Sequence, residues 1–191
     1  LKGVTLDLHA GQITGLAGVS GNGQAALSDM IAGLRRPASG QMFVGESAVS
    51  GWTPARAVQA GIGRVPEDRH KTGTIGDFSL TESAVLERYR DRPFSRAGWM
   101  NRRAADAFAR EVIRRHDVRC PGPQARVRLL SGGNMQKLIL GRVLDSHPRI
   151  ILANQPVRGL DIGAITHVHG RLLAARDAGA AVLLISEDLD E

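Results

Sequence analysis

The sequence places a glycine-rich turn between an apolar strand and a helix, an arrangement that few folds accommodate. Residues 12–17 are predicted to form a short buried strand, and residues 18–23 read Gly-Val-Ser-Gly-Asn-Gly. A helix is predicted from Gln24 to about Ala32, with Gly33 ending it. At such a helix N-terminus, free backbone N–H groups can surround a phosphate. The chain is therefore predicted to be an α/β protein built on a phosphate-binding loop.

This loop keeps the glycines of the standard pattern G-x-x-x-x-G-K-[ST] but not its charged and hydroxyl residues. Gln24 stands in place of the lysine, and Ala25 in place of the hydroxyl that binds Mg²⁺. Losing a charge-assisted contact to phosphate costs roughly 1.5–3 kcal/mol, about ten- to hundredfold in affinity. The loop alone is compatible with a weakened nucleotide site or with a turn that holds no ligand. The candidate binding residues are Gly18, Ser20, Gly21, Asn22, Gly23, Gln24 and Ala25.

The rest of the chain alternates between apolar strand patterns and amphipathic helices. Further strands are predicted at residues 41–44, 62–65, 149–153 and 181–185, and further helices at residues 54–60, 102–116 and 163–178. From about Ile75 to Leu144 the pattern is helical and basic. We therefore expect one domain over residues 1–191, with a core of about 1–74 and 145–191 and a helical subdomain of about 75–144. Because the chain opens without methionine, we expect it to be cut from a longer protein at both ends.

Composition narrows the classes of function. A net charge of +6 fits nucleic acid, an anionic membrane surface or a phosphorylated ligand as partner, or simply solvated helix faces. Aromatic residues are only 4% of the chain and are not interleaved with the basic ones, so a single-strand-binding groove is not indicated. No apolar run reaches about 18 residues, so no membrane-spanning helix is predicted. The single cysteine, Cys120, excludes an internal disulfide, and the scattered histidines predict no metal site.

A second glycine turn precedes another predicted helix, in the segment Leu130-Ser131-Gly132-Gly133-Asn134. A Ser-Gly-Gly turn offers a hydroxyl and free N–H groups to an anion. The segment resembles the LSGGQ signature of ABC-type ATP-binding domains. It has the form, with asparagine fifth and then Gln136-Lys137, that is common in sugar-type importers. The resemblance implies a signature made by Leu130, Ser131, Gly132, Gly133, Asn134 and Gln136.

The apolar strand that follows ends in Asn154-Gln155-Pro156, where ABC domains have Asp-Glu-Pro (the Walker B motif). Asn154 therefore occupies the position of the metal-coordinating aspartate. Gln155 occupies that of the catalytic glutamate, and an amide is a very poor proton acceptor. The next residues, 157–161, resemble the D-loop of the family, and its aspartate, Asp161, is present.

Two further segments are similar to ABC landmarks. Residues 63–69, ending in Pro-Glu-Asp-Arg, resemble the Q-loop region of sugar-type domains, with Glu67 where other ABC domains carry glutamine. Glu67, Asp68 and Arg69 are candidates for contact with a membrane permease, or they form a local ion-pair cluster. Residues 185–189 resemble the switch region, with Glu187 where an active domain has histidine.

The motifs occur in the ABC order, and the resemblance covers nearly the whole chain. It is closest to the second half of tandem ATPase subunits of simple-sugar and nucleoside importers. The resemblance implies an α/β P-loop NTPase fold, with a RecA-like core and an inserted helical subdomain. In this family two domains pair head to tail, and each ATP lies between the Walker motifs of one domain and the signature of the other.

The resemblance therefore implies an ATP-binding domain with a degenerate site of its own, no catalytic residue and no metal ligand. Its signature would act on ATP and Mg²⁺ held by an upstream ATPase domain. The other implied partners are permease subunits and, indirectly, a solute-binding protein, without nucleic acid, at the cytoplasmic face of the membrane. Three alternatives remain open. They are an active ATPase of unusual sequence, a non-transport ABC protein acting on nucleic acid, and a scaffold that binds no nucleotide.

Overall fold

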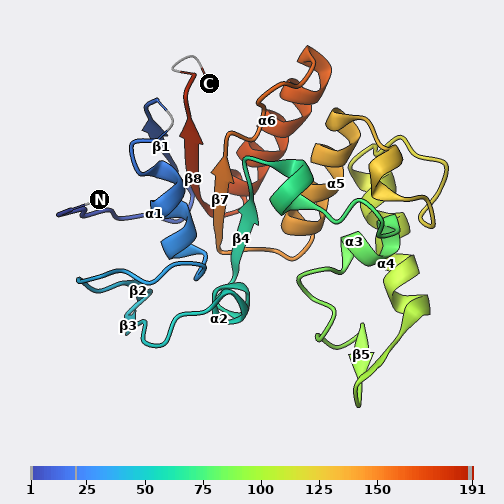
Figure 1. Ribbon diagram of the computed structural model, residues 1–191, viewed down its shortest axis with the longest axis horizontal. Coiled ribbons are helices and arrows are strands. Elements are labelled where there is room, and N and C mark those ends of the chain that lie inside the picture. The colour runs from blue at the N-terminus through green and yellow to red at the C-terminus, as the bar shows by residue number, and fades with distance from the viewer. Residues whose placement is uncertain (1, 20, 189–190) are drawn as a thin grey trace. The chain divides into compact units, whose positions relative to one another are not determined.

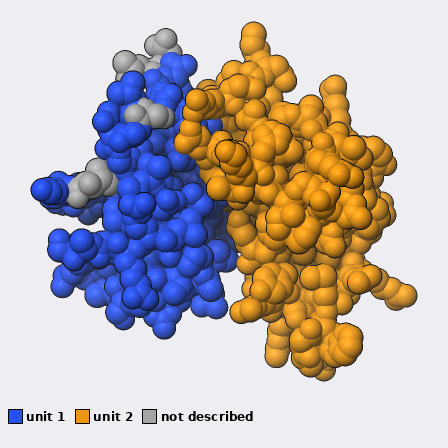
Figure 2. All heavy atoms as spheres, in the orientation of Figure 1, with its two compact units in different colours: residues 1–65, 146–155, 172–191 blue, residues 66–145, 156–171 orange. Residues whose placement is uncertain are grey.

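The computed structural model describes residues 2–19, 21–188 and 191 (Figure 1). The chain divides into two compact units. Unit 1 consists of residues 1–65, 146–155 and 172–191, and unit 2 of residues 66–145 and 156–171 (Figure 2). Each unit draws on separate stretches of the chain, so the parts of each core come from residues far apart in sequence.

Unit 1 contains a four-stranded parallel sheet in the order β1-β8-β7-β4 (Figure 1). The strands are β1 (Ile13–Ala17), β4 (Ile62–Val65), β7 (Ile150–Asn154) and β8 (Ala181–Ser186). On the central strands, Ile151, Leu152 and Leu183 are fully buried. Such continuous burial explains why these strands read as unbroken apolar runs, as strands of a parallel sheet do.

Two helices and a short antiparallel hairpin complete unit 1. The helices are α1 (Gln24–Ile31) and α2 (Pro54–Gln59), and the hairpin joins β2 (Phe43–Val44) to β3 (Ser47–Ala48). Helix α1 stops at Gly33, where φ is +77° and a Cβ atom would lie 2.4 Å from the backbone of Thr53. Only glycine fits there. Thr53 caps α2 by accepting a hydrogen bond from the Arg56 N–H, and Pro54 opens the helix.

Unit 2 is mainly helical, with α3 (Leu80–Ala84), α4 (Arg102–Arg115) and α5 (Gly132–Leu144). A π-helical turn, η1 (Arg69–Gly73), precedes α3, and a 3-10 turn, η2 (Val127–Leu129), lies between α4 and α5 in sequence. Asn101 caps α4, and the buried face of that helix carries Ala105, Ala109 and Val112. Helix α6 (Ile162–Asp177) gives its residues 162–171 to unit 2 and the remainder to unit 1.

The stretch from about residue 75 to 144, whose sequence pattern is helical and broken by prolines, also contains residues 95–100, which are not helical. These form a hairpin of β5 (Ser95–Arg96) and β6 (Trp99–Met100). The two residues between the strands, Ala97 and Gly98, both have positive φ, at 50° and 82°. A two-residue turn with this backbone reverses the chain between antiparallel strands, and it excludes a continuous helix.

Many arginines of the basic stretches pair with carboxylates inside unit 2. The pairs are Arg88–Asp91, Arg110–Asp106, Arg114–Glu111, Arg115–Glu111, Arg115–Asp145 and Arg142–Glu87. Most of these arginine side chains are at least partly exposed, while Arg142 is 4% exposed. A large share of the positive charge is thus balanced locally on helix surfaces.

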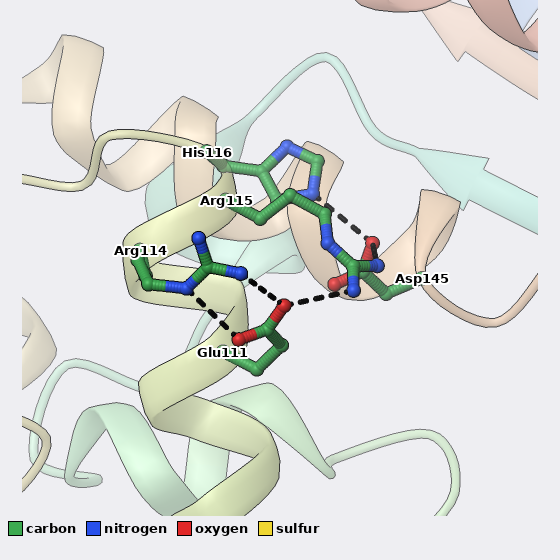
Figure 3. A network of polar contacts seen from close by, with 5 residues as sticks. All are labelled: Glu111, Arg114, Arg115, His116 and Asp145. Carbon is green, nitrogen blue, oxygen red and sulfur yellow. Dashed lines mark hydrogen bonds and ion pairs between the residues drawn. The ribbon is translucent and has the colours of Figure 1, made fainter.

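One of these ion-pair networks reaches the interior between α4 and α5 (Figure 3). His116 is fully buried, and its Nε2 lies 3.2 Å from Oδ1 of Asp145, whose side chain is 6% exposed. Arg115 donates to the same oxygen at 3.0 Å. Burial raises the pKa of Asp145, but the hydrogen bonds and charges of His116 and Arg115 together outweigh it and hold this pKa below its ordinary value.

An Asp145→Asn variant is expected to lose about 1–3 kcal/mol of unfolding free energy at neutral pH. The lowered pKa means that the carboxylate contributes stability above the unfolded-state pKa of about 3.9. This contribution disappears as the pH falls through the folded-state pKa. Urea denaturation should therefore show a large difference between the two proteins at neutral pH and a smaller one near pH 3.

The matched control is Asp177→Asn, whose side chain is 66% exposed and pairs only with its neighbour Arg176 among the described residues. Its unfolding free energy should change by less than about 0.5 kcal/mol. An equal effect of Asp145→Asn at both pH values would show that the charge of Asp145 is not what stabilises this junction.

Candidate nucleotide loop and signature segment

The phosphate loop lies in unit 1, at the carboxyl ends of the parallel strands. Gly18 follows β1 directly, and its N–H donates to the carbonyl oxygen of Ser186 at 3.2 Å. Gly23 is the N-cap of α1, with φ at +104° and no side-chain capping bond. The helix therefore begins with backbone N–H groups that no capping side chain accepts from, which is how an anion site is built. Ser20, one of the predicted binding residues, lies outside the described residues.

The side chain of Gln24 forms a hydrogen bond within the loop. Its Nε2 donates to the carbonyl oxygen of Val19 at 3.0 Å and would lie 2.9 Å from a Cβ atom at Gly18. Its Oε1 is buried and has no hydrogen-bond partner among the described residues. An amide in this position neutralises no phosphate charge. The exposed methyl group of Ala25 offers no ligand to a metal.

The carboxyl end of β7 brings Asn154 and Gln155 to the same edge of the sheet. Their exposed fractions are 5% and 9%, and the Gln155 N–H donates to the carbonyl oxygen of Ile185 at 2.8 Å. Gln155 has φ of +49°, a strained conformation for a residue with a side chain, of the kind that clusters at functional sites. Exposed Glu187 follows β8 at the same edge.

These positions fit Mg²⁺ poorly. The ion is usually held through carboxylates, hydroxyls and phosphate oxygens, whereas Ala25, Asn154 and Gln155 provide one methyl and two amides. Among the described residues, no cluster of three or more histidine, cysteine, aspartate or glutamate side chains could hold a metal. Unit 1 therefore keeps the backbone shape of a nucleotide site without its charged ligands.

The signature segment lies in unit 2, where Ser131 is the N-cap of α5. Its Oγ accepts hydrogen bonds from the backbone N–H of Asn134 at 3.4 Å and from Nδ2 of Asn134 at 2.9 Å. Asn134 is itself held by the Arg119 N–H, which donates to Oδ1 at 2.8 Å. A serine oxygen has two lone pairs, so its own O–H must point elsewhere. Because Ser131 is exposed, this hydroxyl is free to donate to an anion at the helix N-terminus.

The D-loop, residues 157–161, lies beside the signature within unit 2. Asp161 caps α6, with its Oδ1 accepting from the Ala164 N–H at 2.9 Å. Its Oδ2 would lie 3.5 Å from a Cβ atom at Gly133. The structure thus brings together two segments that are far apart in sequence and that sequence reasoning had linked only through family resemblance.

Gln136 differs from Ser131 in its exposure. It was expected to serve a partner's site with Ser131, yet it is only 2% exposed. Its Nε2 donates to the carbonyl oxygen of Pro156 at 2.7 Å, so it joins α5 to the backbone that opens the D-loop. Leu130, 8% exposed, is likewise a core residue.

The Q-loop segment forms ion pairs and caps within unit 2. Glu67 pairs with the guanidinium of Arg158 in the D-loop. Asp68 caps η1, and the hydrogen bonds from the N–H groups of Lys71 and His70 lower its pKa below the ordinary value. Arg69 donates to the carbonyl oxygen of Arg158 at 2.8 Å. Sequence reasoning named these residues as permease contacts or as a local cluster, and it missed their link to the D-loop.

The altered Walker and switch positions lie in a different unit from the intact signature. The altered Walker and switch positions named from the sequence belong to unit 1: Gln24, Ala25, Asn154, Gln155 and Glu187. The signature segment and Asp161 belong to unit 2. A further altered position of an expected motif, Glu67 of the Q-loop segment, belongs to unit 2 with the signature.

A parallel sheet that ends in a glycine loop and a helix N-terminus defines the P-loop class of nucleotide-binding proteins. The chain belongs to the ABC transporter family, whose sequence pattern it matches over residues 1–158. It is 42% identical over its whole length to the guanosine import ATP-binding protein NupO of Bacillus subtilis (strain 168). It is 40% identical to the nucleoside import ATP-binding protein NupA of Lactococcus lactis subsp. cremoris (strain MG1363). The chain covers 38% of the length of each of these relatives.

Solved structures show the same fold. A nucleotide-free ATP-binding cassette from an ABC transporter superposes with a TM-score of 0.79 at 21% identity, covering 100% of this chain and 76% of that one. The dimeric post-hydrolysis cassette MJ0796, bound to ADP and Pi, gives a TM-score of 0.79 at 21% identity, with 97% and 78% covered. The fold is therefore that of an ABC ATPase cassette, an α/β P-loop NTPase. No helix within the described residues has the length and apolarity needed to cross a membrane.

Proposed function

We propose that this chain completes the ATPase site of a partner ABC domain in an importer for a nucleoside or simple sugar, and that it hydrolyses no ATP at its own loop. The observation that carries this proposal is the separation by unit. The phosphate loop and strand ends of unit 1 have lost their cation and carboxylates, while the signature cap and D-loop aspartate of unit 2 are intact.

The chemistry of the signature supports a role in trans. The Ser131 hydroxyl and the N–H groups at the start of α5 form a donor set for the terminal phosphate of an ATP bound by the partner. Neither Gly132 nor Gly133 has a Cβ atom, so a phosphate can approach the backbone closely. Such preorganised donors stabilise the charge that develops during phosphoryl transfer. Mg²⁺ would be held with that ATP by the partner's own ligands.

The phosphate loop of this chain, Gly18 to Ala25, would bind nucleotide weakly or not at all. Gln24 can still donate a hydrogen bond, but its Nε2 is engaged by the Val19 carbonyl oxygen. Gln155 can orient a water molecule but cannot accept its proton. The site of hydrolysis is therefore assigned to the partner domain. An unusual active ATPase would need a lysine and a base that these positions do not supply.

The setting of the protein follows from its relatives, whose names describe nucleoside, guanosine and ribose import. The proposed partners are an ATPase domain of the same polypeptide, permease subunits and, through them, a solute-binding protein. The proposed location is the cytoplasmic face of the membrane, as a peripheral component. The local pairing of many arginines speaks against nucleic acid as a partner.

Nucleotide stoichiometry in the full-length protein tests the degenerate loop. We expect one tightly bound Mg-ATP per polypeptide in the wild type, because only the partner's Walker motifs have a full ligand set. In a Gln24→Lys, Ala25→Ser variant the restored charge and hydroxyl should tighten the second site about ten- to hundredfold and bring the ratio towards two. Equilibrium dialysis with labelled ATP measures both ratios.

A Gln59→Lys, Ala48→Ser variant is the matched control, since it makes the same two kinds of change at exposed positions outside the loop. It should leave the stoichiometry unchanged. Two tightly bound ATP molecules in the wild type would contradict the proposal of a degenerate site. No second binding in the Gln24→Lys, Ala25→Ser variant would favour a scaffold without nucleotide.

A further inference from the structure

The guanidinium of Arg69 occupies a position that the proposed function does not explain. Arg69 opens the π-helical turn η1, which packs on α5, and a Cβ atom at Gly73 would lie 2.7 Å from Ile139 Cδ1. The Arg69 carbonyl oxygen accepts a hydrogen bond from Thr74 Oγ1 at 2.8 Å. The backbone of Arg69 is therefore fixed against the same helix that carries the signature.

From this base the side chain donates to one functional segment and lies close to a second. Its Nη1 donates to the Arg158 carbonyl oxygen of the D-loop at 2.8 Å. Its Nη2 and Nε lie 3.2 and 3.3 Å from a Cβ atom built at Gly132 of the signature. Its Nη2 would also lie 3.6 Å from a Cβ atom at Gly159. A planar, rigid guanidinium can span these groups, whereas a lysine offers a single point of contact.

Ion pairing does not account for this cation. Among the described residues, no carboxylate lies within 4 Å of Arg69, although Glu67 two residues earlier pairs with Arg158. The guanidinium also lies beside the first residue of α5, where the helix dipole disfavours positive charge. The guanidinium instead provides a hydrogen bond to the D-loop backbone and close packing beside Gly132.

A few side chains link the D-loop to the signature helix. Asp161 approaches Gly133, and Gln136 binds the Pro156 carbonyl oxygen. Between these two points, Arg69 and Glu67 provide polar contacts from the rest of unit 2 to the D-loop, both of them at Arg158. Loss of Arg69 would leave the middle of the D-loop without its backbone anchor.

We propose that Arg69 is a positioning residue that holds the D-loop, residues 157–161, against the signature segment, residues 130–134. The two segments then meet the partner's ATP as one preformed surface. This inference rests on the proposed function, because it assigns Arg69 a role at the site that the signature completes in trans. It makes Arg69 neither a phosphate ligand nor a proton donor.

Steady-state ATPase kinetics of the full-length protein in its assembled importer test the proposal with Arg69→Gln, Ser131→Ala and the double variant. Arg69→Gln should lower kcat about tenfold and leave the KM for ATP within about twofold, as expected for lost alignment. Because both residues act through one surface, the double variant should be at most about twofold slower than the worse single variant. If Arg69→Gln instead lowered the rate by reducing the amount of folded protein, its fold-loss would multiply with that of Ser131→Ala in the double variant.

Hydrogen exchange gives a readout that does not depend on activity. Amides of residues 157–162 should exchange faster in Arg69→Gln than in the wild type, while those of residues 138–144 in α5 should not change. Arg69→Lys, which keeps the charge and one donor, should be intermediate in both measurements and serves if Arg69→Gln does not fold. The matched control is Arg110→Gln on α4, with a side chain 63% exposed, which should behave as wild type.

The outcomes separate the two proposals. Wild-type ATPase activity in Ser131→Ala would refute the proposed role of the signature and, with it, this inference. If Ser131→Ala has reduced ATPase activity while Arg69→Gln has normal kcat and normal hydrogen exchange, only the positioning role is overturned. Multiplied effects in the double variant would also overturn it, since they indicate independent action.

Discussion

Replacing Ser131 by arginine is expected to abolish ATP hydrolysis by the assembled importer, even though this domain is proposed to hydrolyse none itself. Ser131 is exposed at the N-terminus of α5, where its hydroxyl is free to donate. Arginine removes this donor and places a long side chain in the space that the partner's phosphate would occupy. Loss of one preorganised donor to a developing anion lowers kcat about 10²–10³-fold, and the steric block adds to it.

The measurement is phosphate release by the importer in proteoliposomes, with Ser131→Thr as the matched control. Threonine keeps the hydroxyl and the N-cap, so activity should remain within a few-fold of wild type. Thermal unfolding should show a small destabilisation of Ser131→Arg, because a lost N-cap costs about 1 kcal/mol. Normal ATPase activity in Ser131→Arg would show that this signature does not serve a working site.

The fold was predictable where local patterns and tertiary structure agree. The central strands β7 and β8 are continuous apolar runs because both of their faces are buried, and the sequence shows this directly. Asn101 and Thr53 are caps whose side chains accept the hydrogen bonds expected of them. The hairpin at residues 95–100 was not predictable in the same way. Its turn uses Ala97 at φ of 50°, and alanine gives no signal for a left-handed backbone.

At the site, the sequence predicts the chemistry of each side chain but not which residues it contacts. The absence of a charge at Gln24 or of a carboxylate at Gln155 can be read from the sequence, since it follows from side-chain chemistry. The burial of Gln136 depends on Pro156, 20 residues away, and the bond of Arg69 depends on Arg158, 89 residues away. Only the tertiary fold brings these pairs together, so their roles had no sequence signal.

The fold of unit 1 can persist although its phosphate loop lacks the usual charged ligands, because different residues form its core. Gln24 and Ala25 open α1, and Asn154 and Gln155 lie at the carboxyl end of β7, outside the apolar cluster of the sheet. The core of unit 1 is made instead by residues such as Leu152, Leu183 and Ile185, which are fully or almost fully buried. Selection on chemistry and selection on packing therefore act on different residues here. A variant that removes core packing should lower stability without acting on the signature.

Leu152→Ala is expected to lower the unfolding free energy by about 2–5 kcal/mol, a large part of the 5–15 kcal/mol typical of a domain. Leu152 is fully buried on β7, opposite Leu183 of β8 and Arg64 of β4, so its removal leaves a cavity in the middle of the sheet. Urea denaturation measures the loss.

Leu173→Ala on α6, at 41% exposed, is the matched control and should change stability much less. Equal losses of unfolding free energy in the two variants would contradict the expected cost of a cavity at Leu152. Activity per folded molecule should be unchanged in both variants, because the signature, Asp161 and Arg69 belong to unit 2.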